Sequence, residues 1–209
     1  FTANDIANFT LTATSQHDNA IVMTLSDTAK VVDDAVIQVT KAQSISTGKT
    51  GTEITYTFNY TNTGTAAARL VLRDILATDV SYKAGSGSWG NGSGSLTDAD
   101  DVEAGANAAI KYKVNSGQVD VELASVAALS KGTVSFKVIV NTNAAEKIPN
   151  TADYQQYNAS NAVIKNTLTN TVIFNVEQTL GVVLNYSSSG ANDDGEPNGG
   201  LNNLQTQNN

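Results

Sequence analysis

Four carboxylates stand close together in the sequence, at positions Asp98, Asp100, Asp101 and Glu103. They follow a glycine-dense segment at residues 85–94, so the backbone that carries them can bend readily. Calcium prefers several hard oxygen ligands supplied by a flexible loop, and this spacing therefore predicts a candidate calcium site. The segment lacks the glycine and the final glutamate of an EF-hand loop. The alternative is a solvated acidic loop that binds no cation, in which case the protein requires no cofactor.

Residue types suited to catalysis are sparse. His17 is the single histidine and lies in a polar segment between two apolar ones, where a surface turn is expected rather than a general base. Asp33 and Asp34 are adjacent, so in a strand their carboxylates would point to opposite faces and could not form a glycosidase pair. The chain has no cysteine, which excludes thiol nucleophiles, disulfides and cysteine-based zinc sites. We therefore expect no catalytic residues, and a protein that is not an enzyme.

Trp89 is the single tryptophan and lies inside the glycine-dense segment. One interpretation is that its indole folds the loop onto a sheet. The other is that the indole is an exposed contact for a surface or a glycan ligand, because tryptophan is common among the residues that dominate binding interfaces.

Composition narrows the range of partners and locations. Twelve basic residues against twenty acidic ones give a formal net charge of −8, which disfavours a nucleic acid partner because phosphates would be repelled. No run of apolar residues is long enough for a transmembrane helix. The chain begins at Phe1 rather than Met, which we interpret either as removal of a secretory signal or as a chain cut at that point.

These functional candidates must be positioned by strands, because the apolar pattern has a period of two. Residues 53–62 alternate aromatic or aliphatic side chains with threonine and asparagine, which predicts a strand with one buried face. The segment Asn115-Ser-Gly117 predicts a hairpin turn. Near the N-terminus Phe9, Leu11 and Ala13 alternate with threonines, which predicts an edge strand or a strand donated to another copy. Residues 125–129 are the one place where a short helical turn is expected.

The resulting prediction is an all-β chain with one large sandwich. We divide it into N-terminal strands at residues 1–38, with a candidate donor strand at 1–14, and a sandwich core at 39–154. Additional C-terminal strands follow at 155–186, and a tail rich in Asn, Gly and Ser occupies 187–209.

Several short motifs of the core recur in a known family. They are Thr40-Lys41, Gly48, Gly51, Tyr60-Thr-Asn-Thr-Gly64, Val71-Leu-Arg-Asp74, Val80-Ser-Tyr82, Ala104-Gly105 and Asn150-Thr-Ala152. With these motifs the chain resembles the conserved repeat domain of unknown function number eleven, which is common in prokaryotic surface proteins. The chain departs from it at Ile75-Leu-Ala77, where the family usually has a proline, and it carries the domain once rather than in tandem. The resemblance implies an immunoglobulin-like β-sandwich outside the cell with a structural or adhesive role, and it implies no reaction.

The sequence therefore predicts a structural protein that is secreted or displayed on the cell surface. Our first hypothesis is a subunit of a pilus-like filament, in which a terminal strand of one copy completes a sheet of the next, as in donor-strand complementation. Its partners would then be other copies of itself. The alternative is a monomeric cell-surface adhesin or carbohydrate-binding module that uses Trp89 and the acidic segment.

Overall fold

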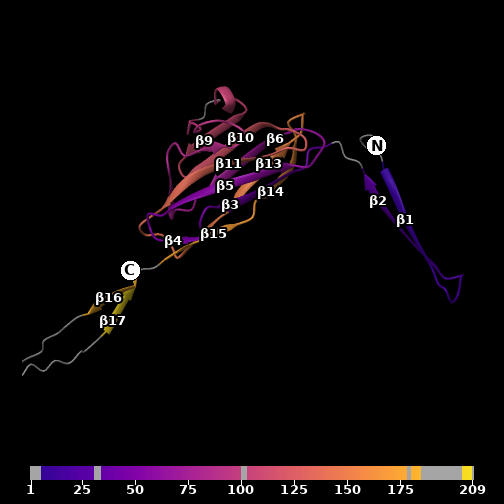
Figure 1. Cartoon of the computed structure of the whole chain (residues 1–209), viewed down its shortest axis with the longest axis horizontal. Coiled ribbons are helices and arrows are strands. Elements are labelled where there is room, and N and C mark those ends of the chain that lie inside the picture. The colour runs from indigo at the N-terminus through magenta and orange to yellow at the C-terminus, as the bar shows by residue number, and fades with distance from the viewer. Residues whose placement is uncertain (1–5, 31–33, 100–102, 178–179, 185–203, 209) are drawn as a thin grey trace, which may run out of the picture.

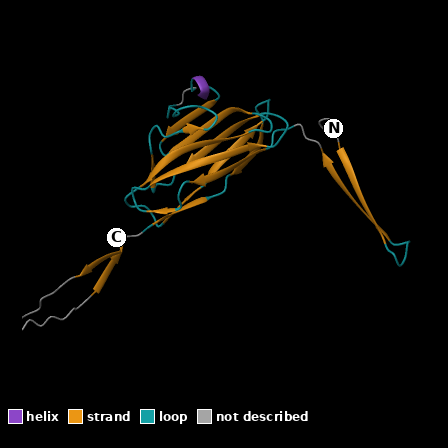
Figure 2. Ribbon diagram, viewed as in Figure 1, coloured by secondary structure: helices purple, strands orange, loops and turns teal. Residues whose placement is uncertain are grey.

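Strands occupy most of the chain, and two sheets of them face one another as a β-sandwich (Figure 1, Figure 2). The structure is a computed structural model, and it describes residues 6–30, 34–99, 103–177, 180–184 and 204–208. The predicted all-β class is confirmed, because the only helical element among the described residues is the 3-10 helix η1 (Gly105–Asn107). No described helix is long and apolar enough to cross a membrane.

The first sheet of the sandwich has five strands, and its two edges are β14 and β9. In spatial order the strands are β14 (Val163–Leu168), β13 (Ala152–Tyr157), β6 (Ala68–Ile75), β10 (Gln118–Val126) and β9 (Ile110–Asn115). The predicted turn joins β9 to β10, and Gln118 pairs directly with Asn115. Ser116 and Gly117 both have positive φ, at 47° and 81°, as a two-residue type I′ turn requires.

The second sheet contains the central strand that the aromatic alternation predicts. Its order is β3 (Ile37–Gln43), β5 (Glu53–Asn62), β11 (Lys131–Val140) and β7 (Val80–Tyr82), and the short β8 (Ser88–Trp89) also pairs with β11. A smaller sheet at one end of the sandwich holds β12 (Lys147–Asn150), β15 (Val172–Val176) and β4 (Thr47–Gly48). The strands expected after residue 154 thus include β14, which pairs with β13 of the first sheet, and β15, which pairs with β12 of the small sheet.

The hydrophobic core lies between the two main sheets, because each strand turns alternate residues inward. Tyr56, Phe58 and Phe136 are fully buried, and their rings meet edge-on or tilted with centroids 5.8–6.0 Å apart. Leu70 and Leu72 come to the same core from β6 on the other sheet. Burial of these large side chains is the main source of stability for a chain without disulfides.

Two hairpins pair with no other strand that the structure describes. At the N-terminus β1 (Ile6–Thr14) pairs with β2 (Val22–Lys30), and toward the C-terminus β16 (Leu180–Leu184) pairs with β17 (Leu204–Asn208). Each forms a separate two-stranded sheet, and Figure 1 shows both projecting from the sandwich. Residues 204–208, the described part of the segment expected to be a polar tail, therefore form a strand.

One local expectation is wrong. Residues 125–129 form no helical turn, because β10 continues through a bulge to Val126 and Leu129 has a φ of 54° in the turn that follows. Val126 is buried in the core, so packing against the opposite sheet keeps this part of the chain extended.

Candidate functional site

The N-terminal hairpin carries an apolar face that no other described part of the chain covers. In its register Leu11 stands opposite Leu25, Ala13 opposite Met23 and Phe9 opposite Asp27, so the three predicted donor residues share one face. Phe9, Leu11, Met23 and Leu25 are between 58% and 71% exposed. The other face carries hydroxyl groups, among them those of Thr10 and Thr12 opposite Ser26 and Thr24.

His17 lies in the loop that joins the two hairpin strands, at an exposed position. Its backbone nitrogen and that of Asp18 both donate hydrogen bonds to the Ser15 hydroxyl, at 3.2 Å each. The Asp18 carboxylate accepts from the backbone nitrogen of Ala20 at 2.9 Å. The loop is therefore ordered by local turn contacts.

Two of the four predicted calcium ligands have structural roles in the loops between β8 and β9. Asp98 accepts hydrogen bonds from the Tyr82 hydroxyl at 2.7 Å and from the Gly85 backbone nitrogen at 2.8 Å. Glu103 accepts from the backbone and the hydroxyl of Thr97, at 2.7 and 2.8 Å. Asp100 and Asp101 lie outside the described residues. Among the described residues no three acidic or histidine side chains gather closely enough to hold a metal ion, so the calcium site stays a prediction.

Trp89 lies against the edge of the core, partly buried. Its Nε1 donates a hydrogen bond to the Tyr60 hydroxyl at 2.9 Å, and the Asn91 side-chain amide donates to the same oxygen at 3.3 Å. Gly132 makes this approach possible, because a Cβ there would lie only 2.1 Å from the Tyr60 oxygen. This geometry favours the interpretation in which the indole fixes its loop to the sheet.

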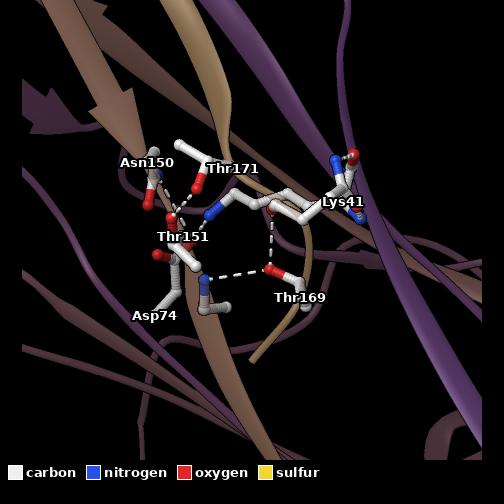
Figure 3. Close-up of polar contacts among 8 residues, drawn as sticks. Lys41, Asp74, Asn150, Thr151, Thr169 and Thr171 are labelled. Atoms are coloured by element: carbon white, nitrogen blue, oxygen red, sulfur yellow. Dashed lines mark hydrogen bonds and ion pairs between the residues drawn. The ribbon is translucent and has the colours of Figure 1, made fainter. Parts of the chain in front are cut away.

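A buried polar cluster lies near the end of the sandwich where the small sheet begins, and the sequence analysis assigned it no role. Lys41 on β3, Asp74 on β6 and Asn150 on β12 converge there, and Figure 3 shows the Lys41 side chain reaching toward the other two. The side chains of Lys41 and Asp74 are fully buried, and Asn150 is 3% exposed. All three strands place these residues where their alternation otherwise puts apolar side chains.

One carboxylate oxygen is shared by both nitrogen atoms of the cluster. Lys41 Nζ is hydrogen-bonded to Asp74 Oδ2, and Asn150 Nδ2 donates to the same Oδ2 at 3.4 Å. The lysine nitrogen also lies over the rings of Tyr56 and Phe58, 4.7 and 5.1 Å from their centroids. Asp74 Oδ1 and Asn150 Oδ1 are buried without a hydrogen-bond partner among the described residues.

Burial changes the protonation chemistry of this cluster. It lowers the pKa of Lys41 to about 8, against the opposing attraction of Asp74. It also raises the pKa of Asp74, although Lys41 and Asn150 act in the other direction. Both shifts favour the neutral amine and the neutral acid over the ion pair.

Surrounding hydrogen bonds hold the cluster in place. The side chain of Asn170 bonds both backbone polar groups of Lys41, accepting from its nitrogen at 2.8 Å and donating to its carbonyl oxygen at 2.9 Å. Next to Asn150, the Thr151 and Thr171 hydroxyls bond one another at 2.6 Å, and the Thr169 hydroxyl accepts from Ala152 N at 3.1 Å (Figure 3).

Comparison with known proteins identifies the fold. The major pilin subunit BcpA of Bacillus cereus matches 82% of this chain and 49% of its own, at 10% identity and a TM-score of 0.51. A variant of the same pilin matches 86% of this chain and 50% of its own, at 10% identity and a TM-score of 0.53. The full-length major pilin SpaD from Corynebacterium diphtheriae matches 66% and 34%, at 17% identity and a TM-score of 0.48. The predicted immunoglobulin-like sandwich is confirmed by the likeness to BcpA, and the chain spans about half the length of that pilin.

No protein-family model and no curated protein matches the chain. The resemblance to the surface-protein repeat domain therefore stays a prediction.

Proposed function

We propose that the protein is a structural subunit of an extracellular, pilus-like filament in which the N-terminal hairpin of one copy adds to the sandwich of the next. The observation that carries the proposal is the exposed apolar face of the β1–β2 hairpin, built around Phe9, Leu11 and Ala13. An isolated two-stranded hairpin is at best marginally stable in water, so a partner for this face would stabilise it. A contact between one copy's hairpin and another copy's sandwich is head-to-tail and can propagate.

The sandwich offers an edge that could receive such a strand. β14 is hydrogen-bonded to β13 on one side and forms an edge of the five-stranded sheet. Val163, Ile164 and Leu168 on this strand are between 45% and 65% exposed. An unpaired edge with exposed apolar side chains is a template for strand addition, because it offers both backbone hydrogen-bonding groups and apolar contacts.

The shared fold supports this proposal over an enzymatic one. Two of the matched structures are described as a major pilin subunit and its variant, although identity of 10% transfers the fold alone. The family resemblance of the sequence likewise predicts a surface location. The adhesin alternative receives no specific support from Trp89, since the indole is engaged by Tyr60.

The test is electron microscopy of the full chain with single substitutions on the two faces of the hairpin. Leu11→Lys places a charge on the apolar face, and Thr12→Lys places the same charge on the hydroxyl-bearing face as a matched control. We expect filaments from the wild type and from Thr12→Lys, and dispersed folded subunits from Leu11→Lys. Filaments of normal length from Leu11→Lys would refute the hairpin as donor, and dispersed particles from the wild type would refute the filament itself.

The same preparation tests the receiving edge and the predicted cation. Ile164→Lys on β14 is expected to stop assembly as Leu11→Lys does, whereas Ile45→Lys, which also replaces an exposed isoleucine, should not. Filament loss in a calcium chelator would support a cation site around Asp98 and Glu103, and unchanged filaments would oppose it.

A further inference from the structure

The Lys41, Asp74 and Asn150 cluster is poorly explained as a stabilising ion pair. Desolvating two charges costs about as much as their attraction returns, so buried pairs contribute little net stability compared with apolar side chains of similar size. The cluster additionally leaves two buried oxygens, Asp74 Oδ1 and Asn150 Oδ1, without partners among the described residues. Each such atom opposes folding, so the arrangement requires another explanation.

We propose that Lys41 and Asn150 react with each other to form an intramolecular isopeptide bond that joins β3 to β12. Asp74 would transfer the protons. A nucleophile, an electrophilic carboxamide and a proton-transfer group would be needed for this reaction, and the three side chains supply one each. They come from three strands, and Asp74 is hydrogen-bonded to both of the other side chains inside the core.

The geometry matches the proton transfers of the reaction. The Lys41 amine attacks Cγ of Asn150, a new bond forms between Nζ and Cγ, and the bond between Cγ and Nδ2 breaks. Nζ must lose a proton and Nδ2 must gain one before it leaves as ammonia. Asp74 Oδ2 is hydrogen-bonded to both of these nitrogens, so in its protonated form it can deliver its own proton to Nδ2 and take up the proton that Nζ loses, and it ends protonated as it began. No oxidant or further reactant is needed.

The surroundings favour the reactive forms of both groups. Attack requires the unprotonated amine, and the buried site lowers the pKa of Lys41 while raising that of Asp74. Transfer of a proton from the lysine to the aspartate therefore removes two buried charges and creates the nucleophile in the same step. The Tyr56 and Phe58 rings border the amine, and the Asn170 contacts fix the backbone from which it projects.

The bond would change how the molecule carries force. The N-terminal hairpin precedes Lys41, and the β16–β17 hairpin follows Asn150. Tension applied through the two hairpins would pass from β3 directly to β12, and the residues between them would not extend. This consequence applies to a filament, but the bond itself is independent of the filament proposal.

The test is the mass of the full chain, measured under denaturing conditions. We expect the wild type to be lighter than its sequence requires by one ammonia molecule, and proteolysis to release a branched peptide that contains both Lys41 and Asn150. Lys41→Arg should have its full sequence mass, because an arginine cannot act as the nucleophile. The matched control Lys165→Arg changes a partly buried lysine bonded to the Ile37 carbonyl oxygen and should retain the loss of ammonia.

Two results would overturn the inference. A wild type with its full sequence mass excludes the bond, whether or not any variant folds. A loss of ammonia that persists in Lys41→Arg, with no branched peptide in the wild type, would instead indicate cyclisation of an asparagine on its own backbone. Asp74→Asn tests the proton-transfer role: we expect bond formation to slow at least tenfold, and a rate equal to the wild type would remove Asp74 from the mechanism.

Discussion

The N-terminal hairpin and the central strand of the sandwich have the same alternation of apolar and polar residues but opposite surroundings. In β5 the inward residues Tyr56 and Phe58 are fully buried against the other sheet. In β1 the corresponding residues Phe9 and Leu11 are mostly exposed, because among the described strands only β2 is bonded to β1.

This contrast separates two properties that are often treated as one. Alternation makes a strand amphipathic, and register puts the apolar residues of paired strands on one face. It does not say which surface covers that face. In the sandwich the cover is the second sheet of the same chain, whereas the described residues provide no cover for the hairpin face.

The strongest test of the contrast is removal of an aromatic ring from each region. Phe136→Ala should lower the free energy of unfolding by about 3–5 kcal/mol, because the ring is fully buried among Tyr56, Phe58 and Tyr82. Phe9→Ala should change it by less than about 0.5 kcal/mol in dispersed subunits. Chemical denaturation measures both. A large loss from Phe9→Ala would mean that the hairpin face is covered within the single molecule.

A second test compares polar contacts in the two regions. Asn62 is fully buried and accepts hydrogen bonds from the backbone nitrogens of Val36 and Gly64. Its side-chain amide also donates to three backbone carbonyl oxygens, at residue 66 and at residues 126 and 127. Asn62→Ala should destabilise the sandwich by about 1–3 kcal/mol, because buried backbone groups lose their partners. Asp18→Ala breaks an exposed turn contact in the hairpin and should have a much smaller effect on the thermal midpoint. Equal losses from the two variants would contradict the distinction.

The smallest expected effect concerns charged side chains on the solvent-facing side of the sandwich. Hydrogen bonds from Lys137 and then from Lys83 lower the pKa of Glu53 below its ordinary value of 4.5. A lowered carboxyl pKa stabilises the folded state above the ordinary value, and this contribution is lost as pH falls through the lowered one. Glu53→Gln should therefore have a shallower acid-induced loss of stability than the wild type, and high salt should reduce the difference. Identical acid unfolding curves for the two proteins would contradict this assignment.

Much of the fold could be predicted from local patterns. The strand at residues 53–62 and the turn at Asn115-Ser-Gly117 follow from alternation and from residues that tolerate positive φ. The expected helical turn at residues 125–129 failed because burial of Val126 against the other sheet overrides a weak local preference.

The polar cluster could have been suspected from the same alternation. Ile37, Val39 and Lys41 occupy successive inward positions of β3, and Asp74 and Asn150 occupy inward positions of β6 and β12. A charged residue at a core position is a signal that sequence alone provides. The signal did not reveal the cluster, because three residues far apart in the chain can meet only after the sheets have paired.

The sequence by itself determined the class of structure, the faces of the strands and the absence of cysteine chemistry, because these depend on residue types and on spacing along the chain. Only the tertiary structure decided that the hairpin face lies uncovered and that Lys41, Asp74 and Asn150 share one buried contact. The uncovered face depends on which strands pair with the hairpin. The cluster depends on strand order and register, which bring together residues 33 positions apart for Lys41 and Asp74 and 76 apart for Asp74 and Asn150, and no local pattern encodes those pairings.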